Sequence, residues 1–104
     1  MERMVNMKND EIVYALRRAI LREYKRYLGA PLRADELPAV SVEILICRSE
    51  ESEVLDQVKE LIGMGYIAPC EGFGGRYLKI TEKGLQQLSP EYKRDPFIWG
   101  RGAL

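Results

Sequence analysis

The sequence contains no histidine, and only two of its 104 residues are cysteines. Without histidine there is no imidazole to act as a general base and no Ser-His arrangement for nucleophilic catalysis. Cys47 and Cys70 are 23 positions apart and belong to no C-x-x-C pair, so a zinc site would lack its usual ligands. The sequence also has no G-x-S-x-G, Walker or dinucleotide-binding pattern. We therefore expect a non-enzymatic protein without cofactor or metal, in which both cysteines are reduced packing residues.

Long apolar runs are missing as well. No stretch approaches the roughly 20 residues that a membrane-spanning helix needs, and the first residues, MERMVNMKNDE, lack the apolar centre of a signal peptide. These features predict a soluble, cytoplasmic protein that does not enter a membrane. With 104 residues, of which 46% are hydrophobic, the chain is long enough to form one domain with its own core.

The formal net charge is zero, but the charges are distributed unevenly. Residues 1–34 carry eight Lys or Arg and four Asp or Glu, residues 35–60 carry two and eight, and residues 61–104 carry six and four. This balance argues against a strongly cationic nucleic-acid binder, yet it leaves a local basic face available.

The clearest helix is predicted from about Glu11 to Leu28, with Asn9 or Asp10 as its N-cap and residues 1–9 as a flexible N-terminus. Apolar residues recur at three- and four-residue intervals and form one face. They are Ile12, Leu16, Ala19, Ile20, Tyr27 and Leu28.

The opposite side of this helix carries a basic stripe, formed by Arg18, Arg22 and Lys25 at positions i, i+4 and i+7. Such a stripe is either a solvated surface or a secondary patch that contacts phosphates.

The region after this helix is the hardest to assign. A short extended piece is expected at Leu32, followed by a turn of helix near Asp35. In residues 40–48, VSVEILICR, the apolar residues alternate as in a strand, but several also share a helical face. The residue types favour a strand and the expected architecture favours a short helix, which is the assignment we expect.

A further helix is predicted over residues 49–64, with Ser49 as its N-cap and Ser52 as an alternative start. Its outward side carries Glu53, Asp56 and Glu60 at i, i+3 and i+7, here called the acidic stripe. The buried side is apolar throughout. It consists of Val54, Leu55, Val58, Leu61 and Ile62.

The segments YIAPC and RYLKIT read as two short strands, and the glycines of the intervening EGFGG suit a hairpin tip. Thr81 is then the expected N-cap of a last helix that extends to about Leu88.

This succession resembles a winged helix-turn-helix domain over residues 10–88, most closely in the run Val54 to Ile67 and in Tyr77-Leu78-Lys79-Ile80-Thr81-Glu82-Lys83-Gly84-Leu85. Strands that follow the wing in this family commonly end in a Leu-Thr-x-x-Gly pattern, which Ile80 to Gly84 fill here. The resemblance implies an α+β fold, mostly helical, with a two- to three-stranded antiparallel wing.

The resemblance also implies a small regulator of transcription that binds double-stranded DNA. Its phosphate contacts would be Arg76 at the return of the wing, Lys79 on the strand that follows and Lys83 at the start of the last helix, with the basic stripe as a secondary patch. The third helix departs from the family, because its acidic stripe would face the phosphate rows of a major groove. The alternative is a winged helix that binds protein through the acidic stripe.

The residues after position 88 form a C-terminal extension, 89–104, with three consecutive large apolar residues, Phe97, Ile98 and Trp99. Exposing them would be unfavourable, so they are expected to pack on their own domain or on a partner, with a homodimer as the favoured assembly.

Overall fold

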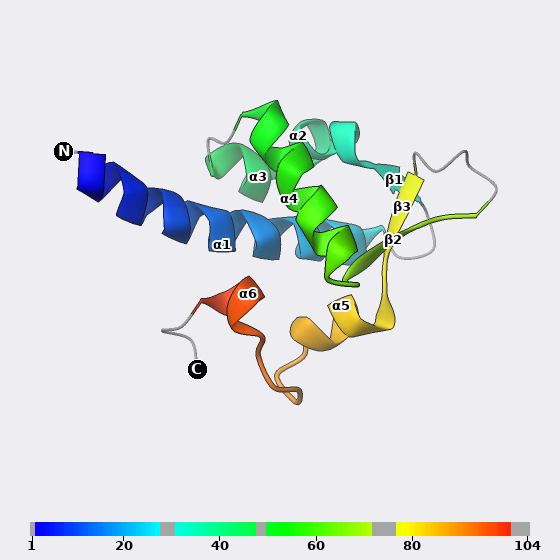
Figure 1. The fold of residues 1–104 in the computed structure, drawn as a ribbon. Helices are drawn as coiled ribbons and strands as arrows, with labels where there is room; N and C mark the ends of the chain where they lie inside the picture. Colours follow the sequence, from blue (N-terminus) through cyan, green and yellow to red (C-terminus); the bar gives the residue numbers. More distant parts are fainter. Residues whose placement is uncertain (1, 28–30, 48–49, 72–76, 101–104) are drawn as a thin grey trace.

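The computed structural model describes residues 2–27, 31–47, 50–71 and 77–100. Helices and three short strands form one α+β unit (Figure 1). This confirms the predicted class at that level. In chain order the elements are α1 (Glu2–Arg26), β1 (Leu32–Arg33), the 3-10 helix η1 (Ala34–Glu36), α2 (Leu37–Val40), α3 (Val42–Ile46), α4 (Glu51–Gly63), β2 (Ile67–Pro69), β3 (Tyr77–Ile80), α5 (Glu82–Gln87) and α6 (Pro96–Trp99).

The long helix α1 lies at the centre, with α3 and α4 on one side and α5 and α6 on another (Figure 1). It begins at Glu2, so the predicted start at Asn9 or Asp10 is wrong. The preceding residues are mostly Met, Glu, Arg and Lys, which are strong helix formers, and one Asn-Asp pair does not interrupt them. The predicted end at Leu28 lies outside the described residues.

The buried part of α1 is wider than one apolar face. Leu21 and Tyr24 are buried together with the predicted Leu16, Ala19 and Ile20. The Tyr24 hydroxyl donates a hydrogen bond to the Leu32 carbonyl oxygen at 3.0 Å, which ties α1 to the first strand. The helices α3, α4, α5 and α6 and the strand β3 all contact α1. The 3.6-residue period of its apolar residues predicts one buried face and does not reveal burial on several sides.

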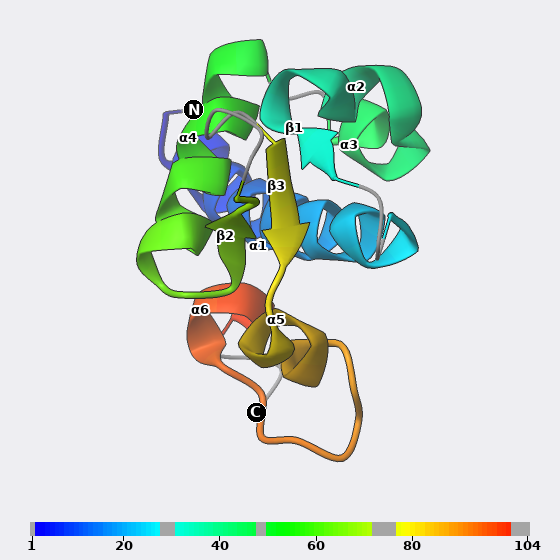
Figure 2. The same ribbon diagram turned by 90° about the vertical axis from the view of Figure 1, so that its right-hand side faces the viewer.

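The three strands form an antiparallel sheet in the order β1-β3-β2. Leu32 pairs with Leu78, and Ile67 pairs with Ile80, so that these apolar side chains face α1 and α4. Figure 2 shows the sheet in front of α1. The predicted hairpin strands are confirmed as β2 and β3. The extended piece predicted at Leu32 is β1, which pairs with β3.

The ambiguous region 40–48 contains the helix α3, as expected. Ser41 explains the start, because its buried hydroxyl accepts a hydrogen bond from the Ile44 amide at 3.2 Å. The predicted cap of α4 is wrong: Glu50 is the N-cap, and its amide donates to the Glu53 carboxylate at 3.3 Å. Ser49 lies outside the described residues.

The helix predicted after Thr81 is α5, which begins as predicted but is followed by the further helix α6. The Thr81 hydroxyl accepts a hydrogen bond from the Gly84 amide at 3.1 Å and donates one to the Gly65 carbonyl oxygen at 2.6 Å. One side chain therefore caps the helix and fixes it to the turn that follows α4.

Candidate functional site

The exposed side of α4 is acidic in the structure, as the sequence predicted. Val54, Val58 and Leu61 are buried, and all three carboxylates of the acidic stripe are exposed. None of the ion pairs between described residues includes a member of the stripe. Among the described residues the stripe is therefore an anionic surface without an ion pair, although Arg17 attracts Glu60 electrostatically and the Glu50 amide donates to Glu53.

Two of the predicted phosphate contacts are described lysines, Lys79 on the hairpin strand β3 and Lys83 in the first turn of α5. Lys79 is exposed on β3, opposite Ala68 of β2. The Lys83 ammonium donates to the Met64 carbonyl oxygen at 2.7 Å and lies 4.7 Å from the centre of the Tyr66 ring. Because an ammonium has three donors, Lys83 can bind a further acceptor. The predicted contact Arg76 lies outside the described residues.

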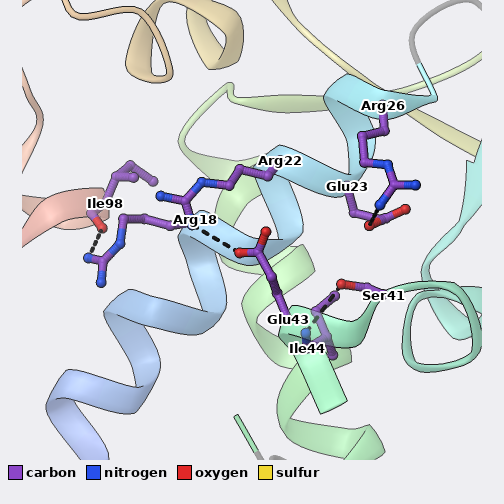
Figure 3. Close-up of polar contacts among 8 residues, drawn as sticks. All are labelled: Arg18, Arg22, Glu23, Arg26, Ser41, Glu43, Ile44 and Ile98. Carbon is purple, nitrogen blue, oxygen red and sulfur yellow. Dashed lines mark hydrogen bonds and ion pairs between the residues drawn. The ribbon is translucent and has the colours of Figure 1, made fainter. Parts of the chain in front are cut away.

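Two cations of the basic stripe have partners within the chain (Figure 3). Arg18 donates to the Ile98 carbonyl oxygen at 3.2 Å, and Arg22 forms an ion pair with Glu43 at 3.0 Å. Burial, followed by the charges of Arg22 and Arg94, lowers the pKa of Arg18 below its usual value. The third cation, Lys25, is exposed. The stripe is thus partly a structural element and less free to bind phosphates than the sequence suggests.

The C-terminal segment packs on its own chain. Ile98 is fully buried in the core, and Phe97 and Trp99 are half-buried against it. The indole N–H of Trp99 donates to the Gln87 carbonyl oxygen at 3.1 Å. Of the two alternatives for this segment, the structure shows the intramolecular one, and Ile98 is not accessible to a partner in this conformation.

Arg17, which the sequence analysis did not single out, holds this segment in place. Its guanidinium donates to the Gln57 side chain of α4 and to the Phe97 carbonyl oxygen, both at 2.8 Å, and it lies 3.8 Å from the centre of the Phe97 ring. A cation at the carbonyl end of α6 is favourable because those carbonyl groups lack helical partners. No spacing rule distinguishes Arg17 from its neighbour Arg18.

Asp95 is the second residue that the sequence analysis missed. Its carboxylate accepts a hydrogen bond from the Phe97 amide at 2.9 Å and another from the Tyr66 hydroxyl. A signal was present, since Asp followed by Pro is typical of a helix start. Asp95 therefore caps α6 and joins it to the strand region.

The buried tyrosines predict a loss of stability in alkaline solution. Burial raises the pKa of Tyr24 well above its usual value of 10, and burial together with the Asp95 hydrogen bond does the same for Tyr66. Above pH 10 the folded chain keeps both protons and the unfolded chain releases them. We expect the free energy of unfolding to fall by up to about 1.4 kcal/mol per pH unit for each tyrosine there, with no such loss below pH 10.

Ultraviolet absorbance of tyrosinate, followed together with circular dichroism, checks this expectation. Two of the six tyrosines should ionise only as the chain unfolds. Ionisation of all six near pH 10 with the fold intact would contradict the buried environment of Tyr24 and Tyr66.

No described helix is long and apolar enough to cross a membrane. Within the described ranges, no group of three or more Cys, Asp or Glu side chains could hold a metal ion. Comparison of the chain with protein-family models, curated proteins and solved structures gave no significant match. The functional proposal therefore rests on the chain's own residues and topology.

Proposed function

We propose that the chain is a non-enzymatic winged-helix module that associates with double-stranded DNA, as a small regulator of transcription does. The order of elements supports this proposal. A hairpin, β2–β3, follows α4 directly, and the strand before α2 completes the sheet as β1-β3-β2. In this assignment the hairpin is the wing, and α4 occupies the place of the helix that faces DNA.

The charges favour the wing as the contact surface. Lys79 is exposed, and Lys83 lies beside the turn after α4. The acidic stripe of α4 would be repelled by the two phosphate rows of a major groove. The wing would therefore bind phosphates while α4 is kept out of the groove. Lys25 is the member of the secondary patch that is exposed and forms no ion pair with a described residue.

A salt series with a labelled duplex tests this assignment. We expect affinity to fall linearly with the logarithm of salt concentration, and Lys79→Ala to reduce that slope by about one. Lys59→Ala is the matched control, because it removes one exposed lysine from α4 and should leave the slope unchanged. Fluorescence anisotropy measures both. No binding at low salt, or equal losses in the two variants, would contradict the proposal.

The second candidate is a winged helix that binds protein through the acidic stripe, either a second copy of this chain or another partner. It is favoured by one observation: the stripe is exposed, and no described ion pair neutralises it. The variant Glu53→Gln, Asp56→Asn, Glu60→Gln separates the two candidates. DNA affinity should stay unchanged or rise if the wing binds DNA, whereas self-association seen by sedimentation at low salt should disappear if the stripe is the interface.

A further inference from the structure

A hollow lies beside α1, between α3 and the C-terminal part of the chain. We call it the basic cleft. Its volume is about 530 Å³, within the range of roughly 300–1,000 Å³ that is usual for small-molecule sites. A separate, smaller hollow of about 210 Å³ along α1 shares Arg22 and Glu43 as lining residues. The basic cleft is lined by Arg22, Lys25, Arg26, Glu43, Leu88 and Trp99.

The lining combines positive charge with an apolar side. Leu88 and Trp99 both pack against the core and supply the apolar part. The guanidinium of Arg94 lies 4.2 Å from the centre of the Trp99 ring and that of Arg18 lies 5.3 Å from it, so two further cations lie next to Trp99 without lining the cleft themselves. An apolar surface next to several cations suits a ligand that has an apolar body and an anionic group.

The cations are only partly compensated within the chain. Arg22 pairs with Glu43, and Arg26 lies 3.7 Å from the buried carboxylate of Glu23 (Figure 3). Lys25 is exposed and forms no ion pair with a described residue. Holding like charges close together is unfavourable, and a bound anion would relieve that repulsion.

We propose that the basic cleft binds a small organic anion, one that carries a carboxylate or phosphate group on a compact apolar body. The anionic group would contact Lys25 and the guanidinium of Arg22 or Arg26, and the apolar body would lie against Leu88 and Trp99. A guanidinium presents paired donors that match either oxyanion. The site is separate from the wing, and its ligand would contact α1 and the C-terminal segment together.

Trp99 makes the test direct, because it is the only tryptophan in the chain and lines the cleft. The full-length protein is titrated with cyclohexanecarboxylate, with uncharged cyclohexanecarboxamide and with phenyl phosphate, and Trp99 fluorescence and calorimetry are followed. We expect the two anions to bind and the amide not to bind up to about 10 mM. Tighter binding of the carboxylate or of the phosphate ester identifies the preferred anionic group.

Matched lysine variants locate the site. Lys25→Gln should weaken binding of the preferred anion about fivefold, and Lys59→Gln, which removes the same charge from α4, should leave it unchanged. Methyl phosphate, which carries the same monoester group but little apolar surface, should bind at least about tenfold more weakly than phenyl phosphate.

Three results would overturn the proposal: equal binding of anion and amide, equal effects of the two lysine variants, or equal binding of methyl phosphate and phenyl phosphate. None of these measurements uses DNA, so their outcome is independent of the wing assignment.

Discussion

Gly84→Ala is expected to destabilise the protein by about 3 kcal/mol, because the first turn of α5 has no room for a methyl group. A Cβ atom at this position would lie 2.7 Å from Cγ1 of Ile80 and closer still to the Tyr66 carbonyl oxygen. That oxygen accepts the Thr81 amide hydrogen bond at 3.0 Å, so the backbone cannot move away without weakening the joint between strand and helix. Urea unfolding followed by circular dichroism measures the change.

Gly63→Ala is the matched control for this substitution. It makes the same chemical change at the last residue of α4, where a Cβ would meet nothing within 4 Å. Since alanine is the better helix former, we expect it to be neutral or to stabilise by up to about 1 kcal/mol. Similar changes in the free energy of unfolding at the two positions would show that helix propensity, and not the contact with Tyr66, determines the effect of Gly84→Ala.

Ile98→Ala is expected to cost about 3 kcal/mol, although it lies within seven residues of the C-terminus. Its side chain is fully buried in the cluster that contains Leu16 and Ile20 of α1, so truncation leaves a cavity between α1 and α6. Arg17 and Arg18 still bind the carbonyl groups of α6, so the segment should stay docked with a loosened core.

Two readouts separate the effect of Ile98 on the core from local fraying of the terminus. Global unfolding in urea should shift to lower concentration, and Trp99 fluorescence should follow the same transition as circular dichroism. Val42→Ala, at a side chain that is 70% exposed, should change stability by no more than about 0.5 kcal/mol. A loss below about 1 kcal/mol for Ile98→Ala would contradict the view that α6 belongs to the cooperative unit.

Gly84 and Ile98 also show how the Thr-x-x-Gly pattern and the C-terminal extension, here called the tail, contribute to the packing of the fold. The Thr-x-x-Gly pattern is met here by a hydroxyl that caps α5 and by a glycine that lets the helix approach the strand closely. The tail completes the core on the side of α1 that α3 and α4 leave uncovered. Trp99 of the tail lines the basic cleft, so a ligand that binds there would be expected to stabilise the docking of the tail.

The amino-acid sequence by itself determined the elements whose signals are local. Three signals span only a few residues each: the apolar spacing of Val54, Val58 and Leu61, the Thr81 cap, and the glycine-rich sequence between the strands. They predicted α4, α5 and the hairpin strands β2 and β3. The exposed acidic stripe followed from the same spacing, because the polar side of an amphipathic helix faces solvent when nothing packs on it.

Only the tertiary structure decided which residues act together across long distances in the chain. Arg17 bridges α4 and α6 through partners 40 and 80 positions away in the chain. The helix at residues 42–46 and the docking of Ile98 on α1 depend on which side chains the fold buries. The basic stripe is also less free to bind phosphates than its spacing suggests, because Arg22 pairs with Glu43 and Arg18 donates to the Ile98 carbonyl oxygen. Helical spacing places a side chain on a face, but packing determines what that face meets, and therefore what remains free to bind.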